Sequence, residues 1–407
     1  MSTGIFTSNN LTTDFAKKSF AGMITRLMPN GAAPLFGITS MLSSETAAQF
    51  EHGFFTKTMI FPYVQLNGAI ADGTTTTFTV VSSTNILPGM ILRVNSTGEN
   101  VIVNSVVSAT QITVSRGVGT VAAAAISDAV QLYQVGSAFE ESSVRPNALI
   151  INPVRITNYT QIFRNTWAVS DSVRATLTIA GESNVAESKQ DCAAFHAADI
   201  EKALIFGQKS SGTRNGQPFH TMAGLVALVT DPTYYPDSYG GVANVSTAGS
   251  TTNYTQLEGF LDPVFNQTTD PKGANERVLF VGGTAKKVLN NIGRLNGTYQ
   301  MMDGQTSWGL QFSTIKLARG TFRIIEHPLL NTNSSWSKMA LAVDLATFKV
   351  AYLGDRKTQN KEFNMDSDAN DNGIDAVGGT LTTELTCVLK NPPANSVVYN
   401  LTAAAAG

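Results

Sequence analysis

The sequence predicts an α+β fold on three observations. Residues 182–208 form the only long segment with strong helical character in a chain of 407 residues. Around this segment lie short runs rich in Thr, Val and Asn, which are typical of strands and loops. Several of these strands would pair across long separations in sequence, which is typical of the α+β class.

The helix predicted over residues 182–208 needs a partner layer, because a helix is stabilised mainly by packing one of its faces. The residues expected on the buried face share helical spacing: Ala193, Ala197, Ile200 and Leu204. The residues expected to cover much of the remaining surface are charged: Glu187, Lys189, Asp191 and Glu201. Five alanines between Ala193 and Ala203 would let another layer approach closely. We interpret this helix as a spine that supports sheets, not as a catalytic element.

The composition favours contact with other chains. Charged residues make up only 14% of the chain, against roughly 25% in typical soluble domains, and Thr, Ser, Asn and Gly replace them. A Thr-rich β protein without such contacts is the alternative on composition alone. The length predicts two or three domains. The net charge of −2 provides no basic field for nucleic acid.

Cysteine content and hydropathy bear on location. Cys192 and Cys387 are too few for a disulfide framework, and we expect two buried thiols in a reducing cytoplasm. The N-terminal residues lack the basic and apolar regions of a secretory signal. No run approaches the ~20 apolar residues of a membrane span. We therefore expect a soluble protein without a membrane partner.

The first part of the chain contains two different sequence patterns. Residues 1–66 are predicted to form an irregular arm with a short helix over residues 14–28. Residues 67–137 instead contain short β-type runs separated by turn signals, at 74–81, 90–94, 101–107 and 111–115. Because the segments before and after lack this regular spacing of short strands and turns, we expect an inserted small all-β domain over residues 67–137.

The rest of the chain mixes helices and strands. Extended runs are predicted at 159–169, 174–179, 277–282, 321–326, 339–343, 348–353 and 380–390. Beyond the spine, helices are predicted at 258–266 and 284–292. Residues 295–308 and 364–379 are predicted loops.

No motif identifies a catalytic, cofactor or metal site. The GxGxxA pattern at 117–122 runs into another predicted strand instead of a helix, so we interpret it as a turn. The Asp- and Asn-rich loop at 368–373 lacks the carboxylate that closes a calcium loop, since Gly379 stands at the twelfth position. Glu140 and Glu141 are adjacent, and on a strand they would point to opposite faces. We therefore expect no enzyme activity and no bound cofactor.

Several motifs follow an order that resembles one known family. In the first half these are Pro34-Leu35-Phe36, Phe50–Phe55, Asn158–Phe163 with Ala168-Val169-Ser170, Glu187-Ser188-Lys189-Gln190 and Asp199–Ala203. In the second half these are Gly320–Ile325, Pro328–Leu330, Leu341–Asp344, and Thr383–Thr386 followed by Asn391-Pro392. In this order they resemble the major capsid proteins of tailed bacteriophages, which have the Hong Kong 97-type fold.

The resemblance implies a division of the chain. It implies an N-terminal arm and start of the extended loop over 1–66, return strands of that loop over 138–181, and a P-domain spine with its following segment over 182–229. It further implies an A-domain over 230–345, and P-domain strands with the C-terminus over 346–407. The predicted domain at 67–137 resembles a β insertion that one subgroup carries in its extended loop.

The resemblance also implies a function. Pentamers and hexamers of the chain would form an icosahedral shell that encloses double-stranded phage DNA without sequence-specific binding. Assembly would take place in the host cytoplasm, with scaffold, portal and cement proteins as further partners. The alternatives are a β-rich tail or surface-binding protein and a cellular nanocompartment shell, and a cytosolic enzyme comes last.

The candidate contacts between subunits follow from the pattern of charge. No lysine occurs between Lys57 and Lys189, so arginine carries all positive charge in that span. The absence of a lysine from 58–188 also excludes the extended-loop cross-link that some family members make, so we expect a non-covalent shell. Arginine forms two-point contacts with carboxylates, although simple solvent exposure is the alternative. The candidates are Arg145, Arg155, Arg164, Arg174, Glu140 and Glu141, with Met301, Met302 and Trp308 from the loop at 295–308.

Overall fold

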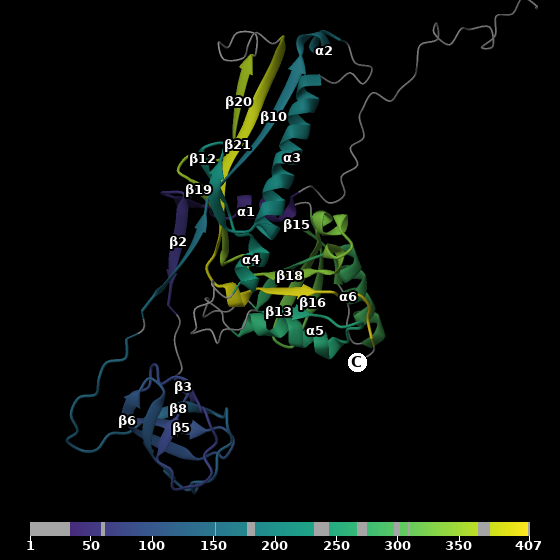
Figure 1. The fold of residues 1–407 in the computed structure, drawn as a ribbon. Coiled ribbons are helices and arrows are strands. Elements are labelled where there is room, and N and C mark those ends of the chain that lie inside the picture. Colours follow the sequence, from purple (N-terminus) through teal and green to yellow (C-terminus); the bar gives the residue numbers. More distant parts are fainter. Residues whose placement is uncertain are drawn as a thin grey trace, which may run out of the picture. The chain divides into compact units, whose positions relative to one another are not determined.

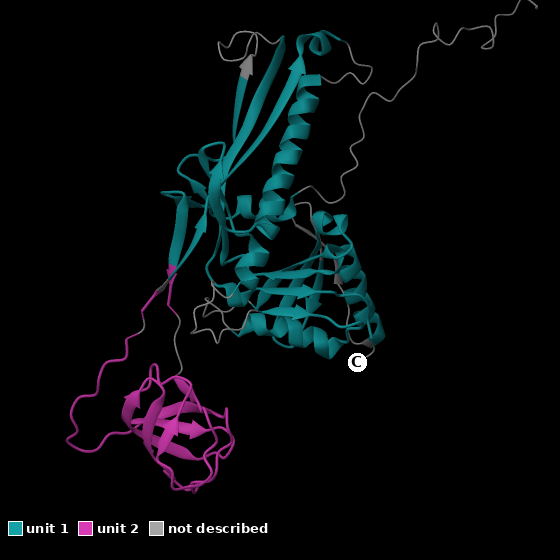
Figure 2. Ribbon diagram, in the orientation of Figure 1, with its two compact units in different colours: residues 1–54, 155–407 teal, residues 55–154 magenta. Residues whose placement is uncertain are grey.

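The computed structural model describes residues 33–57, 62–150, 152–176, 184–231, 244–266, 275–296, 302–307, 310–364 and 375–405. The chain divides into two compact units, which Figure 2 shows in different colours. Unit 1 contains residues 1–54 and 155–407, and unit 2 contains residues 55–154. Unit 2 is therefore a continuous insertion into the sequence of unit 1. The helix expected over residues 14–28 lies outside the described residues.

Unit 2 contains a six-stranded antiparallel sheet (Figure 1). In spatial order its strands are β3 (Tyr63–Gln65), β8 (Gln131–Ser137), β5 (Met90–Val94), β6 (Asn100–Ser108), β7 (Gln111–Ser115) and β4 (Thr77–Thr79). Burial alternates along β5, where Leu92 is buried and Arg93 is exposed, because successive side chains of a strand point to opposite faces. The buried residues form a hydrophobic core within unit 2.

A buried ion pair follows β7. The Arg116 guanidinium donates hydrogen bonds to both carboxylate oxygens of Glu99, at 2.9 and 2.6 Å, and the two side chains are only 4% and 0% exposed. The N–H of Gly117 donates to the same carboxylate at 3.0 Å. Gly117 and Gly119 have positive φ, which glycine adopts at no steric cost. No helix occurs within 117–122, so the glycine pattern there forms a turn, as predicted.

The first sheet of unit 1 carries the long helix. Its strands are β1 (Glu45–Ala47), β19 (Phe348–Leu353), β21 (Ala376–Leu389) and β10 (Gln161–Ser170), with β20 (Gln359–Asn364) also paired to β21. Only the pairing of β1 with β19 is parallel. Helix α3 (Asn184–Phe206) lies along β10 and β21 (Figure 1). The helix lies within the predicted span 182–208, and it supports a sheet as expected.

The face that α3 buries was predicted in part, since Ile200 and Leu204 are buried as expected. The buried residues are Cys192, His196, Ile200, Glu201, Leu204 and Ile205. Ala193 is exposed, and Glu201, which was expected at the surface, is fully buried. Successive residues of a helix are about 100° apart, so Cys192 and His196 lie on one side of the predicted stripe, and Glu201 and Ile205 lie on the other. The prediction of a close-packed alanine face is therefore wrong at Ala193, because larger side chains fill the layer against the sheet.

His196 joins α3 to both neighbouring strands. Its Nδ1 lies 2.7 Å from Oδ1 of Asn165 on β10, and its Nε2 lies 2.7 Å from the hydroxyl of Thr383 on β21. Burial lowers the pKa of His196, partly offset by the charge of Asp199. The histidine is thus a packed helix residue that joins the helix to the sheet.

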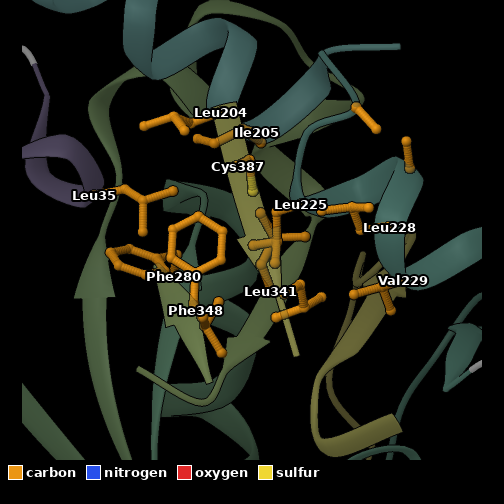
Figure 3. Close-up of a cluster of buried hydrophobic side chains, with 14 of the residues drawn as sticks. Leu35, Leu204, Ile205, Leu225, Leu228, Val229, Phe280, Leu341, Phe348 and Cys387 are labelled. Atoms are coloured by element: carbon orange, nitrogen blue, oxygen red, sulfur yellow. The ribbon is translucent and has the colours of Figure 1, made fainter. Parts of the chain in front are cut away.

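The second sheet of unit 1 has seven strands. In spatial order they are β13 (Val245–Thr247), β22 (Ser396–Tyr399), β18 (Ala340–Val343), β14 (Glu276–Val281), β17 (Thr321–Glu326), β16 (Leu310–Lys316) and β15 (Met302–Ser307). On β14, Leu279 belongs to the core that includes residues of α5 (Tyr254–Leu261) and α6 (Gly283–Asn296). The next residue, Phe280, belongs to a second core with Leu204 of α3 and Leu228 of α4 (Leu225–Thr230), as Figure 3 shows. The sheet therefore packs on both of its faces.

The remaining elements connect these layers. They are α1 (Pro34–Met41), β2 (Glu51–Thr56), β9 (Val154–Tyr159), α2 (Asp171–Ala175), β11 (Ser210–Arg214), β12 (Gln217–Thr221), and the 3-10 helices η4 (Asp262–Phe265), η5 (Pro328–Thr332), η6 (Trp336–Lys338) and η7 (Pro392–Ala394). In the described part of the chain, no helix is long and apolar enough to cross a membrane. Both cysteines are free and buried, as predicted, and burial raises the pKa of each thiol.

Several predicted elements need correction. Arg174, expected in an extended run, lies in α2, because the Ser170 hydroxyl accepts the N–H of Val173 and caps a short helix. The predicted loop at 295–308 contains β15, which forms a hairpin with β16. The predicted loop at 364–379 ends earlier, because β21 begins at residue 376. Strand β22, which was not predicted, lies in the second sheet beside β18.

Candidate inter-subunit surfaces

The chain enters and leaves unit 2 through a two-stranded ribbon, β2 paired with β9. At the root of this ribbon, the Glu51 carboxylate lies 3.8 Å from the Arg155 guanidinium and 3.9 Å from the Lys209 ammonium. Lys209 also donates to the carbonyl and the hydroxyl of Thr157, both at 2.8 Å. Its ammonium lies over the ring of Tyr159, 4.7 Å from the centroid. Segments far apart in sequence thus meet around one carboxylate.

Aromatic rings pack together at the same end of the ribbon. The His220 ring of β12 stacks on Phe50, with centroids 4.8 Å apart and planes inclined by 8°. The same ring lies 5.2 Å from Tyr159. The hairpin β11–β12 therefore packs on the ribbon through His220. We define the root cluster by its members: Phe50, Glu51, Arg155, Thr157, Tyr159, Lys209 and His220.

The negative charge of Glu51 is stabilised by the groups around it. A hydrogen bond from Thr157 and the charges of Arg155 and Lys209 hold the pKa of Glu51 below its usual value. Burial lowers the pKa of Lys209, and the charge of Glu51 partly offsets this effect. Glu51 is therefore a carboxylate at neutral pH and anchors two cations to the ribbon.

The arginines singled out in the sequence have different surroundings. Arg155 pairs with Glu51, and Arg174 pairs with Asp171 at 3.1 Å, both within the subunit. Arg145 and Arg164 are exposed, and within the described ranges neither makes an ion pair. Of these four candidates, Arg145 and Arg164 are therefore the two without a carboxylate partner among the described residues.

The other predicted contact residues are placed only in part. Glu140 and Glu141 lie in an exposed turn, in which the N–H of Ser143 donates to the carbonyl of Glu140 at 3.2 Å. They are not on a strand, so the expected alternation of faces does not apply to them. The backbone of Met302 belongs to β15, opposite Thr314. The other two loop candidates, Met301 and Trp308, lie outside the described residues.

Residues 138–150, which we call the extended segment, pack little on their own subunit apart from Phe139 and Leu149, which keep 46% and 40% of their surface exposed. Every residue in this range is exposed, and none belongs to a helix or strand. The segment carries four large apolar side chains: Phe139, Val144, Leu149 and Ile150. Val144 is 89% exposed and Ile150 is 74% exposed. Single exposed apolar residues are normal, so four of them within one short run are the feature of this segment that needs an explanation.

The root cluster was not identified from the sequence. Its members come from separate segments around residues 50, 155, 209 and 220, and no spacing pattern links them. Three members lie in motifs noted in the sequence, Phe50 and Glu51 in the Phe50–Phe55 stretch and Tyr159 in the Asn158–Phe163 stretch, but the motifs did not indicate that these residues meet. The extended segment was noted only for its charged residues, although its apolar side chains were visible.

Comparison with known proteins found a matching family model and a related phage protein. The family model described as SU10 major capsid protein matches residues 7–402. A protein described as a major capsid protein, from Pseudomonas phage PaMx41, is 36% identical over 408 residues, which cover 98% of this chain and 96% of that protein. The solved structure from Mycobacterium phage Cain has a TM-score of 0.47 and 10% identity, over 99% of this chain and 100% of that chain. The structure from Gordonia phage Cozz has a TM-score of 0.46 and 14% identity, over 97% of this chain and 93% of that chain.

The family model and the PaMx41 protein both extend over most of the chain. They confirm the resemblance to phage capsid proteins, and they do not favour a tail protein, a surface-binding protein or a nanocompartment shell. The α+β class is confirmed by the two mixed sheets and their helices. This is a phage capsid shell protein, and the chain belongs to the SU10 major capsid protein family.

Proposed function

We propose that this capsid protein builds its shell without covalent cross-links, by laying the extended segment of each subunit on a neighbouring copy. The exposure of Val144 and Ile150 carries this proposal. Covering apolar surface contributes about 25 cal/mol per Å², so these side chains favour association once a second copy is present. Arg145 and Arg164, with Glu140 and Glu141, would add charged contacts around the covered surface.

The sheets suggest how the subunit is divided. The first sheet with α3 would be the P-domain, and the second sheet with α5 and α6 would be the A-domain. Because β22 pairs with β18, the A-domain would include the C-terminal strand as well as residues 230–345. Residues 1–66 would provide the arm and the start of the extended loop, and 67–137 the inserted β domain. The arm and the extended segment would both reach over neighbouring subunits.

The same proposal covers the partners. Pentamers and hexamers would close an icosahedral shell around double-stranded DNA in the host cytoplasm. A net charge of −2 is consistent with enclosing DNA without gripping it, because strong phosphate binding needs a basic surface. A scaffold, a portal and cement proteins would complete the particle.

Substitution in the extended segment tests the proposal. Val144→Asp places a charge on the surface to be covered, and we expect closed shells counted by negative-stain microscopy to fall at least about tenfold. Val81→Asp is the matched control, since Val81 is another exposed valine of unit 2 outside the segment. Equal shell yields from both variants would contradict the role of the segment. Ladders of linked subunits from boiled shells on a denaturing gel would contradict non-covalent assembly.

A further inference from the structure

A carboxylate lies fully buried on helix α3, at Glu201. Its Oε1 accepts a hydrogen bond from the backbone N–H of Leu35 at 2.7 Å, and its Oε2 accepts one from the N–H of Phe36 at 2.7 Å. Nε2 of His327 lies 2.6 Å from Oε1. Glu201 and His327 are both 0% exposed, so these contacts are made away from bulk water.

The second nitrogen of His327 shows which atom carries the proton. Nδ1 accepts a hydrogen bond from the backbone N–H of Leu329 at 3.2 Å, so it carries no hydrogen. Nε2 therefore carries the hydrogen of the neutral ring and donates it to Glu201. The carboxylate thus accepts three N–H donors, which offset the cost of burying its charge.

Two of these donors lie at the start of α1. The first N–H groups of a helix have no acceptor within the helix, and the N-terminus carries partial positive charge. Pro34 occupies the first turn, and Ala33 at the N-cap provides no side-chain hydrogen bond. Glu201 supplies the missing acceptor and a negative charge, from a position 166 residues after Leu35.

We propose that Glu201 is a positioning residue for shell assembly, because it fixes the direction in which the N-terminal arm leaves the subunit. Leu35 and Ile38 also pack in the hydrophobic core, but apolar contacts are non-directional. Hydrogen bonds from two successive N–H groups to one carboxylate set the tilt and rotation of α1. Residues 1–32 join the body at Ala33, so the orientation of α1 sets their starting direction. The inference rests on the proposed role of the arm in covering neighbouring subunits.

His327 ties this contact to the second sheet. The residue follows β17, and its ring packs edge-on against Phe280 of β14, with centroids 5.9 Å apart. A shift of the second sheet along α3 would therefore move the Nε2 donor away from Glu201. Such a shift would leave α1 held only by its two backbone donors. The direction of the arm is thereby coupled to the packing of the second sheet on α3.

Hydrogen–deuterium exchange on the full chain tests the anchor. In Glu201→Gln the charge is lost, and the amide NH2 cannot accept from the N–H that it faces. We expect exchange across Leu35–Met41 to rise about tenfold or more, while exchange across β14 stays within about twofold, with fewer closed shells. Glu187→Gln, the same substitution at a partly exposed position of the same helix, should change neither. Unchanged exchange in α1, or equal acceleration everywhere, would overturn the proposal.

A second pair of variants keeps the test decisive if Glu201→Gln does not fold. The side-chain amide in His327→Gln can still donate to Glu201, whereas the side chain in His327→Leu cannot. We expect α1 to exchange faster in the leucine variant than in the glutamine variant. Equal rates would overturn the coupling through His327.

Deletion of residues 1–32 separates this inference from the function on which it rests. Normal shell yields from the truncated chain would refute the role of the arm, and with it the role of Glu201 in assembly. Loss of shells from the truncated chain, together with normal shells from Glu201→Gln, would refute only the positioning role.

Discussion

The two units of this subunit differ in how far apart in sequence their neighbouring strands lie. In unit 2, β5, β6 and β7 follow one another in sequence and also lie side by side in the sheet. In unit 1, β21 lies between β10 and β20, and the strands of the first sheet come from residues 45–47, 161–170, 348–364 and 376–389. Local pairing closes short loops, whereas distant pairing closes long ones at a higher entropic cost. We therefore expect the two units to respond separately to mutation, with unit 2 folding from its own residues.

Arg116→Met should have the largest effect, and only in unit 2. Glu99 would remain charged in a buried site without its ion partner, and removal of one member of a buried pair costs roughly 3–5 kcal/mol. The measurement is chemical denaturation of unassembled subunits. In the Arg116→Met variant, the unfolding transition of unit 2 should move to a lower denaturant concentration, and the transition of unit 1 should stay in place. Arg93→Met, at an exposed arginine of β5, is the control and should shift neither transition by more than about 0.5 kcal/mol. A common shift of both transitions would mean that the units are not independent.

Gly379→Ala should have a smaller effect, confined to unit 1. A Cβ at Gly379 would lie 2.7 Å from Nε1 of the buried Trp167 ring, on the strand opposite. Forcing an extra methyl group into a packed site costs roughly 1–3 kcal/mol. Gly37→Ala is the matched control, because no atom lies within 4 Å of the added carbon in α1. The control should be neutral or slightly stabilising in thermal unfolding, and equal losses in both variants would contradict the packing argument.

The smallest effect should be the loss of unit 2 stability when acid protonates Asp72. The hydroxyl of Thr75 and the N–H groups of Thr75 and Thr74 donate to this carboxylate and lower its pKa from 3.8 to about 2. A lowered carboxyl pKa stabilises the fold fully above pH 3.8, and this stabilisation is lost as pH falls toward 2. We expect Asp72→Asn to lower the stability of unit 2 at neutral pH, and the gap to the wild type to close near pH 2. A gap that is constant down to pH 2 would contradict this assignment, and the unit 1 transition provides an internal reference.

Local patterns were sufficient for elements whose residues favour one conformation. The runs at 321–326 and 348–353 coincide with β17 and β19, because their apolar and β-branched residues match a buried strand. Helix α3 was predicted from its helix-forming residues. The capped helix α2 was missed although Ser170 followed by Asp171 is a helix-start signal in the sequence.

Other features depend on partners that no local pattern reveals. Met302–Ser307 contains Asp, Gly and Ser, and it becomes a strand by pairing with β16. Glu201 has the spacing of a surface residue, yet its partners lie 166 and 126 residues away in sequence. The root cluster depends on four separate segments in the same way. Burial of charge is thus decided by tertiary contacts, not by periodicity.

The route of the chain through β2 and β9 has a practical consequence. Because these strands pair where the chain passes into and out of residues 55–154, the inserted unit is attached through two adjacent connections. A foreign domain whose own ends lie close together could therefore replace residues 67–137, because the ribbon, the root cluster and the extended segment would all stay in the chain. A shell that still formed from such a fusion would carry one foreign domain on every subunit.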